Sequence, residues 1–170
     1  MPSEAATLGA AGEHYVLFQL LRRGFIAALA PHGVPMADII LSNRLGTKLC
    51  AGQVKTRSGI GADGGWHMNV KHETIREPSL FYCFVDLRND EKSVPDVYVV
   101  PSEVVATVIS ETYQAWVAAP GKNGRVRKQH KLRRFVPDYT RYDCPKYSNG
   151  WLTAYRNSWD LLKGKNVQHE

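Results

Sequence analysis

The chain has 170 residues, of which 44% are hydrophobic and 22% are charged. These values are typical of a globular protein and exclude disordered and fibrous classes, and no apolar run approaches the length of a membrane span. The length fits a single domain over residues 1–170, and the net charge of +6 favours a polyanionic partner. The amino terminus lacks the basic start of a signal peptide, which predicts a cytoplasmic location.

The first predicted element is one long helix over residues 4–23, which opens a core domain over 4–112. Apolar residues recur there at helical spacing, and Gly24 supplies a stop signal. Glu13, Leu17 and Leu20 are spaced so that a carboxylate shares the side of the helix that carries core leucines. A carboxylate in that position needs a partner, such as a metal, a lysine or backbone amides.

Three strands are expected next, over residues 25–30, 36–42 and 48–56, and the last two form a hairpin with a turn at 43–46. For such a turn the numbers of facing residues sum to about 89–91, which places Asp38 opposite residues 51–53. Gln53 and Lys55 stand two residues apart and therefore point to one face of their strand. The hairpin alone thus predicts that Asp38, Gln53 and Lys55 lie together.

The remaining core elements follow a glycine-rich loop over 58–65. We expect a short helix over 71–77, strands over 80–87 and 96–100, and a helix from 102 to about 112. The order of elements predicts an α/β sandwich with a mixed sheet. His67 and His72 are expected at the surface, with a proton shuttle or a metal ligand as the alternative, and Cys50 and Cys83 in apolar runs are expected to be buried thiols.

The positive charge is concentrated in a basic segment over residues 121–135. This segment has no acidic residue, and its seven cations exceed the net charge of the whole chain. The seven are Lys122, Arg125, Arg127, Lys128, Lys131, Arg133 and Arg134. Two interpretations stay open, a surface that contacts phosphates and a solvated basic loop.

The last predicted element is a C-terminal helix over residues 151–163. Trp151, Tyr155 and Trp159 are spaced by four and form an aromatic stripe. We expect this stripe to pack on the body of the domain, with base stacking as the alternative.

The order of Glu13 on a first helix, Asp38 on a strand and Gln53-Val54-Lys55 on the next strand resembles the core of the PD-(D/E)XK nuclease superfamily. The resemblance implies a restriction-endonuclease-like fold, a three-layer α/β sandwich with a mixed central β-sheet flanked by helices. Gln53 is a variant, because the family usually has Asp or Glu there. The segment from Gly52 to Arg57 also resembles part of archaeal-type Holliday junction resolvases.

The resemblance implies a metal-dependent DNA endonuclease that hydrolyses phosphodiester bonds. Mg²⁺ or Mn²⁺ would be held by Glu13, Asp38, Gln53 and the carbonyl group of Val54, which are the hard oxygen ligands that these cations take. Lys55 would orient and help to deprotonate the attacking water. Arg57 and the basic segment would grip the backbone of duplex or branched DNA, and a homodimer would reach both strands.

Alternatives from other classes remain open at this point. The chain could be a catalytically inactive nucleic-acid-binding module on the same fold, as Gln53 would allow. It could also be a protein-interaction or immunity-type protein. In a purely structural interpretation, Asp38 caps a turn, Lys55 pairs with Glu13, and Gln53 bonds to the backbone.

Overall fold

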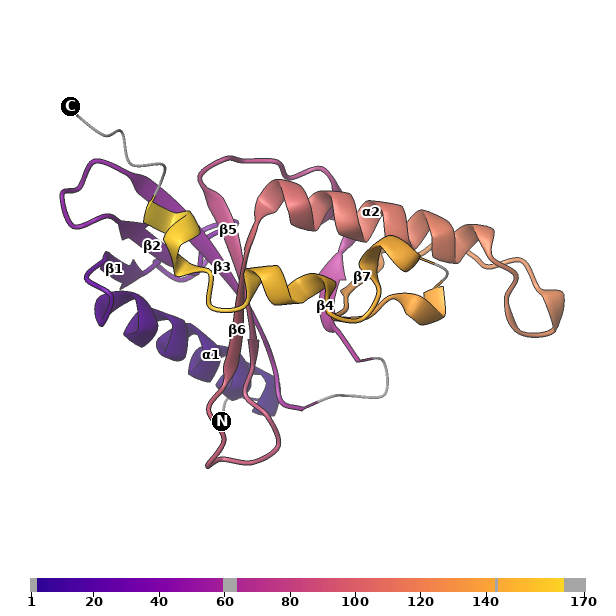
Figure 1. The fold of residues 1–170 in the computed structure, drawn as a ribbon, viewed down its shortest axis with the longest axis horizontal. Helices are drawn as coiled ribbons and strands as arrows, with labels where there is room; N and C mark the ends of the chain where they lie inside the picture. The colour runs from indigo at the N-terminus through magenta and orange to yellow at the C-terminus, as the bar shows by residue number, and fades with distance from the viewer. Residues whose placement is uncertain (1–2, 60–63, 143, 164–170) are drawn as a thin grey trace.

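The computed structural model describes residues 3–59, 64–142 and 144–163, except for the side chain of Lys122. Its strands form a five-stranded sheet and a separate two-stranded sheet, and two long helices lie beside them (Figure 1). The helices and strands are α1 (Glu4–Leu21), β1 (Ile26–Leu29), β2 (Ile39–Ser42), β3 (Leu49–Arg57), β4 (Trp66–Asn69), β5 (Leu80–Asp86), β6 (Asp96–Pro101), α2 (Ser102–Ala118) and β7 (Leu132–Phe135). Among the described residues, no helix is both long and apolar enough to cross a membrane.

Helix α1 begins where the sequence predicts and ends two residues earlier. The Ser3 hydroxyl group accepts a hydrogen bond from the Ala6 amide at 3.2 Å and caps the first turn. Gly24 takes a left-handed conformation with φ of 79°, which ends the helix and turns the chain into β1. Val16 and Leu20 form the buried stripe of the helix.

The main sheet has the strand order β1-β2-β3-β5-β6, with β3 and β5 parallel and the other neighbours antiparallel. Strands β2 and β3 form the expected hairpin, in which Ile39 faces Gly52. That register lies within the predicted range, and Asp38, just before β2, bonds to Gly52, inside the predicted 51–53. The mixed sheet of the sequence prediction is therefore confirmed.

A separate core covers each face of this sheet. Helix α1 packs on one face against alternate residues of β3, β5 and β6, together with Trp159 and Leu162 near the C-terminus. Helix α2 and the small sheet of β4 and β7 pack on the other face, where Trp66, Phe84 and Phe135 form an aromatic centre. Strand β5 is buried along its whole length between these cores, and Cys83 and Cys50 are buried as expected.

The pairing of β4 with β7 does not follow from the sequence prediction, which assigned no strand to residues 121–135. Met68 faces Arg133 in this small antiparallel sheet. The expected helix over 71–77 is a shorter 3₁₀-helix, η1 (Val70–Glu73), capped by the Asn69 side chain. Helix α2 continues to Ala118, beyond the expected end near residue 112.

The prediction of one helix over residues 151–163 is wrong. The segment forms two 3₁₀-helices, η5 (Trp151–Tyr155) and η6 (Trp159–Lys163), on either side of Asn157, which takes a φ of 54°. The amide of Asn157 donates a hydrogen bond to the Val97 carbonyl at 2.8 Å, so the backbone turns to follow the edge of β6. The three aromatic residues still pack on the body: Trp151 and Tyr155 join one core and Trp159 joins the other.

Candidate active site

The β2–β3 hairpin brings three of the predicted site residues together: Asp38, Gln53 and Lys55. Asp38 immediately precedes β2, where its amide donates to the Gly52 carbonyl at 2.9 Å. Its carboxylate oxygen Oδ2 accepts a 2.7 Å hydrogen bond from the amide of Val54. Gln53 follows Gly52, the residue to which Asp38 bonds, and Lys55 lies two residues farther along the same face of β3 as Gln53. Asp38 therefore does not cap a turn, and it ties its strand to β3 at the level of Gln53.

Helix α1 crosses β3 at very short range and brings Glu13 close enough for the charges of Asp38 and Lys55 to act on it. The contact is made by Gly12, where an added Cβ atom would lie only 1.9 Å from the Thr56 hydroxyl oxygen. Partial burial raises the pKa of Glu13, and the negative charge of Asp38 raises it further. Two carboxylates that repel each other in a partly dry site are an arrangement that a bound cation stabilises.

The Lys55 amine is half-buried in the same cluster. Burial lowers the pKa of Lys55, the nearby Asp38 carboxylate raises it in part, and Lys71 lowers it further. No ion pair within 4.0 Å joins Lys55 to Glu13 among the described residues. The amine is thus near both carboxylates without being neutralised by a direct contact with Glu13.

Gln53 is the residue whose surroundings fit a cation most clearly. Its side chain is 8% exposed, and its oxygen Oε1 is buried without a hydrogen-bond partner in the described part of the chain. A buried oxygen with no donor costs free energy unless something positive approaches it. No cluster of three His, Cys, Asp or Glu side chains occurs within residues 3–59, 64–142 and 144–163. The candidate ligand set therefore consists of two carboxylates and an amide oxygen.

Sequence reasoning missed a buried pair beside this cluster. It placed His72 at the surface, which is wrong, because His72 is only 3% exposed and its Nδ1 lies 2.7 Å from the Tyr82 hydroxyl oxygen. Burial lowers the pKa of His72 to about 4, and the charges of Lys55 and Lys71 contribute. Tyr82 is the neighbour of Gln53 across the parallel β3–β5 pair. No local sequence signal identifies this pair, since η1 brings His72 onto β5 only in the folded chain; His67 on β4 is exposed as expected.

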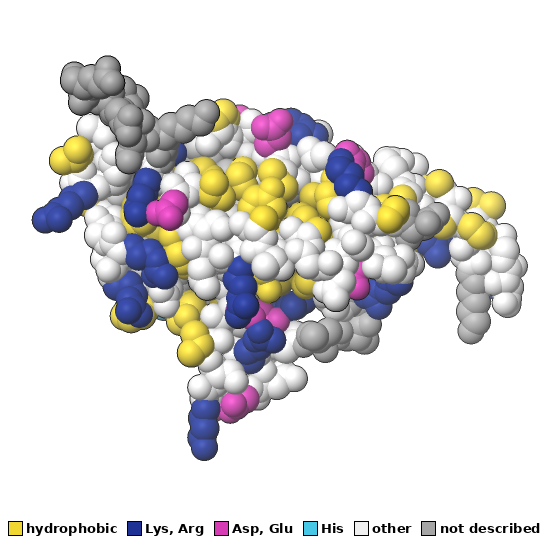
Figure 2. All heavy atoms as spheres, viewed as in Figure 1, with side chains coloured by type: hydrophobic (Ala, Val, Ile, Leu, Met, Phe, Trp, Pro, Cys, Tyr) yellow, Lys and Arg dark blue, Asp and Glu magenta, His cyan; other side chains and the backbone are white. Residues whose placement is uncertain are grey.

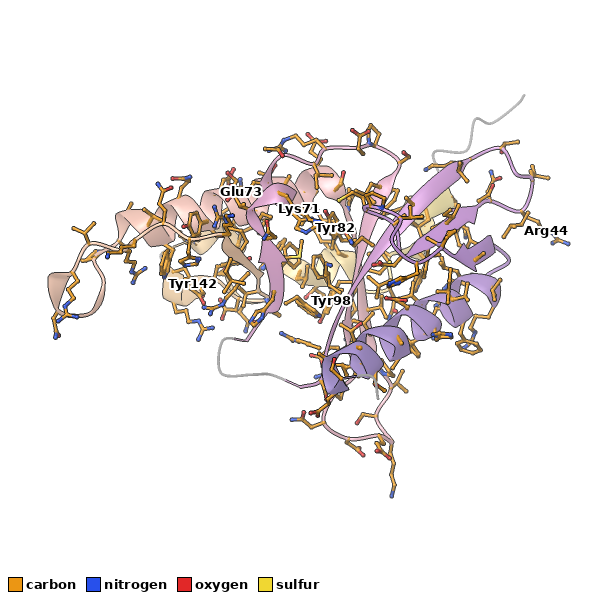
Figure 3. The ribbon with its side chains drawn as sticks, turned by 180° about the vertical axis from the view of Figure 1, so that it is seen from behind. Arg44, Lys71, Glu73, Tyr82, Tyr98 and Tyr142 are labelled. Atoms are coloured by element: carbon orange, nitrogen blue, oxygen red, sulfur yellow. The ribbon has the colours of Figure 1, made fainter. Side chains whose placement is uncertain are left out.

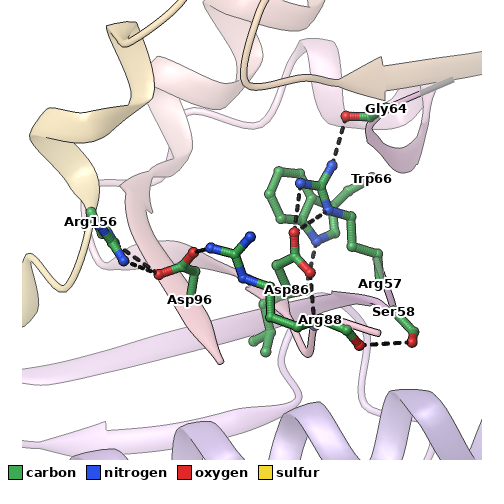
Figure 4. A network of polar contacts seen from close by, with 9 residues as sticks. Arg57, Ser58, Gly64, Trp66, Asp86, Arg88, Asp96 and Arg156 are labelled. Atoms are coloured by element: carbon green, nitrogen blue, oxygen red, sulfur yellow. Dashed lines mark hydrogen bonds and ion pairs between the residues drawn. The ribbon is translucent and has the colours of Figure 1, made fainter. Parts of the chain in front are cut away.

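Arg57 lies at the end of β3 in a network of polar contacts (Figure 4). Its guanidinium group pairs with Asp86 at 2.8 Å, donates to the Gly64 carbonyl at 2.6 Å and stacks 3.9 Å from the centre of the Trp66 ring. Its side chain is 12% exposed. Arg57 remains a predicted phosphate contact. To bind a phosphate, its guanidinium group would first have to leave Asp86.

The basic segment is divided between internal and exposed positions. Arg133 is 6% exposed and pairs with Glu73 of η1, and Arg127 donates to the Trp116 carbonyl at 2.7 Å. The side chain of Lys122 lies outside the described residues. Four members are exposed: Arg125, Lys128, Lys131 and Arg134. On the face seen in Figure 2, lysine and arginine side chains form small groups separated by white and yellow surface.

Comparisons with known proteins extend the description of the fold. No family model matches the chain, and no curated protein matches it in sequence. A solved structure of a bacterial homing endonuclease is similar over 95% of this chain and 92% of its own, with a TM-score of 0.51 and 15% identity. The Holliday junction resolvase Hjc of Archaeoglobus fulgidus, an archaeal hyperthermophile, matches over 75% and 83% of the two chains, with a TM-score of 0.38 and 16% identity. The first similarity confirms the fold expected from the sequence: this chain has a restriction-endonuclease-like α/β fold, with helices on both faces of a mixed sheet.

Proposed function

We propose that the chain is a metal-dependent endonuclease that hydrolyses phosphodiester bonds in DNA. The observation that carries the proposal is the buried oxygen of Gln53, which has no hydrogen-bond donor among the described residues and belongs to the residue after Gly52, to which Asp38 bonds. Glu13, Asp38, Gln53 and the Val54 carbonyl group would hold Mg²⁺ or Mn²⁺ through oxygen. When bound, such a cation polarises the phosphate and makes a water molecule more acidic.

Lys55 is the residue that we assign to the attacking water. Its lowered pKa increases the fraction of uncharged amine at neutral pH, and an uncharged Nζ can accept a proton from the water. The charged form that results is stabilised by Asp38 and Glu13, whose charges both favour it. One side chain can therefore take the proton and hold it while the leaving oxygen departs.

The exposed cations of the basic segment are the proposed contacts to the DNA backbone. Arg125, Lys128 and Lys131 can reach phosphates without breaking an ion pair that the structure shows, and Arg134 is a further exposed cation of the same segment. Contacts of this kind give affinity and salt dependence without sequence choice. Arg133 stays a predicted contact that would first have to leave Glu73. The cytoplasmic location and the homodimer also stay predictions.

Gln53 favours a second candidate function, an inactive DNA-binding module. An amide in place of a carboxylate removes one negative charge from the ligand set, and affinity for a divalent cation falls as charge is removed. This candidate predicts DNA binding that weakens steeply with salt and no cleavage with any metal. A protein-interaction role predicts neither binding nor cleavage of DNA at physiological salt.

The proposal is tested by cleavage of plasmid and branched DNA with Mg²⁺, with Mn²⁺ and with chelator. We expect nicking with either metal and none with chelator. Lys55→Ala should lower the rate by at least about 100-fold, as expected for loss of a general base. Lys92→Ala is the control, since Lys92 is an exposed lysine in the β5–β6 connection. Intact DNA in every reaction, together with salt-dependent gel shifts, would favour the binding module instead.

A further inference from the structure

A hollow lies between the outer half of α2, strand β7 and the 3₁₀-helix η3 (Thr140–Tyr142). The hollow is small, with a cavity volume of about 50 Å³, and it opens to solvent. Aromatic rings dominate its walls, among them Tyr113 and Trp116 of α2, His130 and Tyr142. The hollow is separate from the metal-ligand candidates, and the basic segment supplies one of its sides.

The aromatic wall is held in a defined geometry. The rings of Tyr113 and Trp116 stack with centroids 5.7 Å apart and an angle of 25° between planes, and His130 lies edge-on to both. The Tyr113 hydroxyl group accepts a hydrogen bond from the His130 amide at 2.8 Å and donates to the His130 carbonyl at 3.2 Å. These two bonds fix the basic segment against α2, so the wall exists before any ligand arrives.

Positive charge accompanies the rings at close range. The guanidinium carbon of Arg127 lies 4.7 Å from the Trp116 ring centroid, and that of Arg133 lies 3.2 Å from the Tyr113 ring centroid. Lys128, Lys131 and Arg134 are exposed on the same segment. Flat rings beside cations are the combination that binds an unstacked base together with its phosphate. A protein ligand of acidic character would match the charge but would leave the stacked rings unused.

The hollow is connected to the candidate active site by η1. Arg133 on the wall of the hollow pairs with Glu73, the residue after His72. His72 in turn contacts Tyr82, the cross-strand neighbour of Gln53. Figure 3 shows Glu73, Lys71 and Tyr82 close together, with Tyr142 beyond Glu73. A nucleotide bound in the hollow would therefore lie next to η1, and η1 in turn lies next to the candidate active site.

We infer that this hollow binds an unpaired nucleobase of the DNA, so that the substrate is a duplex containing unpaired nucleotides. The inference rests on the proposed function, because it names the form of DNA that the same site would cut. The base would stack on the Trp116 side of the wall, where Arg127 would move from the ring to a phosphate. Paired DNA would still contact the exposed cations but would leave the hollow empty.

The test is the binding of two DNA duplexes in chelator, where no cleavage interferes. One duplex carries a single unpaired 2-aminopurine, and the other carries the same base paired with thymine. We expect the wild type to bind the first about tenfold more tightly and to quench its fluorescence by stacking. Trp116→Leu should lose the preference for the unpaired base and keep its affinity for the paired duplex. Trp116→Phe should retain most of the preference for the unpaired base. Phe18→Leu, a change at an exposed aromatic residue of α1, is the matched control.

Two results would overturn the inference: equal affinity of the wild type for both duplexes, or an unchanged preference in Trp116→Leu. Thermal unfolding shows whether each variant is folded, and Tyr142→Leu gives a second change at the hollow if Trp116→Leu is not. If the wild type binds and cuts the paired duplex without any preference, only the inference fails. If it binds neither duplex, the inference and the proposed function fail together.

Discussion

The Val54 amide and the Asp38 carboxylate are joined by a 2.7 Å hydrogen bond that crosses from β3 to the residue before β2. One carboxylate oxygen thus accepts from the backbone, while the charge of the group still acts on Glu13 and Lys55. Asp38 therefore has two roles: it accepts a hydrogen bond that joins the start of β2 to β3, and it is a proposed metal ligand. Substitutions can separate these two roles.

Asp38→Asn should abolish cleavage and change the free energy of unfolding by less than about 1 kcal/mol, because the amide oxygen can still accept from Val54. Asp38→Ala should abolish cleavage as well and also lower the free energy of unfolding by about 1–3 kcal/mol, since the Val54 amide loses its partner. Urea denaturation together with cleavage assays measures both effects. Equal stability of the two variants would show that the hydrogen bond contributes little.

Gln53→Glu should restore the charge that the amide lacks. We expect tighter binding of Mg²⁺ or Mn²⁺, by about tenfold, and a faster cleavage rate, because a carboxylate binds hard cations more strongly. Titration calorimetry with each cation measures the affinity. Gln19→Glu is the control, since Gln19 is an equally buried glutamine on α1 whose side chain bonds to Arg23. Unchanged cation affinity in Gln53→Glu would remove residue 53 from the proposed ligand set.

His72 should make the protein acid-sensitive. Its pKa is lowered from the ordinary value of 6.5 to about 4, so the unfolded chain binds a proton more readily than the folded chain. The resulting contribution to the free energy of unfolding is present in full above pH 6.5 and is lost as the pH falls through 4. We expect a loss of about 3 kcal/mol in the free energy of unfolding across this window.

His72→Asn, which keeps a polar group near the Tyr82 hydroxyl, should flatten this pH dependence in urea denaturation experiments. Gln114→Ala, a change at an exposed neutral residue of α2, provides the control and should leave the slope unchanged. A wild type whose stability is constant from pH 7 to pH 4 would contradict the prediction.

Gly12→Ala should be destabilising although alanine favours helices. The new Cβ atom would lie 1.9 Å from the Thr56 hydroxyl oxygen, which forces α1 away from β3 at a cost of about 1–3 kcal/mol. Gly9→Ala, three residues earlier in α1, meets no atom within 4 Å and should stabilise the protein by up to about 1 kcal/mol. Thermal unfolding distinguishes the two. Since Glu13 follows Gly12, we also expect Gly12→Ala to slow cleavage, and equal stability of both variants would contradict the close packing.

The parts of the fold that could be predicted are those set by local patterns. Alternation in the two strands and the turn between them set the hairpin register, and this register placed Asp38 beside Gly52 and next to Gln53. The helical spacing in α1 put Glu13 on the correct helix. Its approach to the hairpin depends on the contact between Gly12 and Thr56, which joins residues far apart in sequence.

The parts that could not be predicted depend on distant partners. Strand β7 pairs with β4, and the high charge of residues 121–135 concealed the alternation in which Arg133 and Phe135 point inward. Arg133 is buried because Glu73 and the Tyr113 ring accompany it, neither of which is near it in sequence. The same holds for His72, whose burial follows from the position of Tyr82.

The C-terminal segment has a consequence for the behaviour of the protein at high concentration. Strand β6 ends the main sheet, and the segment around Asn157 occupies part of its outer edge through the bond to Val97. An uncovered edge offers unpaired amide and carbonyl groups to another chain. A shortened protein that ends at Gly150 would expose this edge together with the apolar surface that Trp159 and Leu162 cover. Residues 151–163 therefore protect this edge of the sheet from pairing with another chain, a role separate from the chemistry proposed for the hairpin.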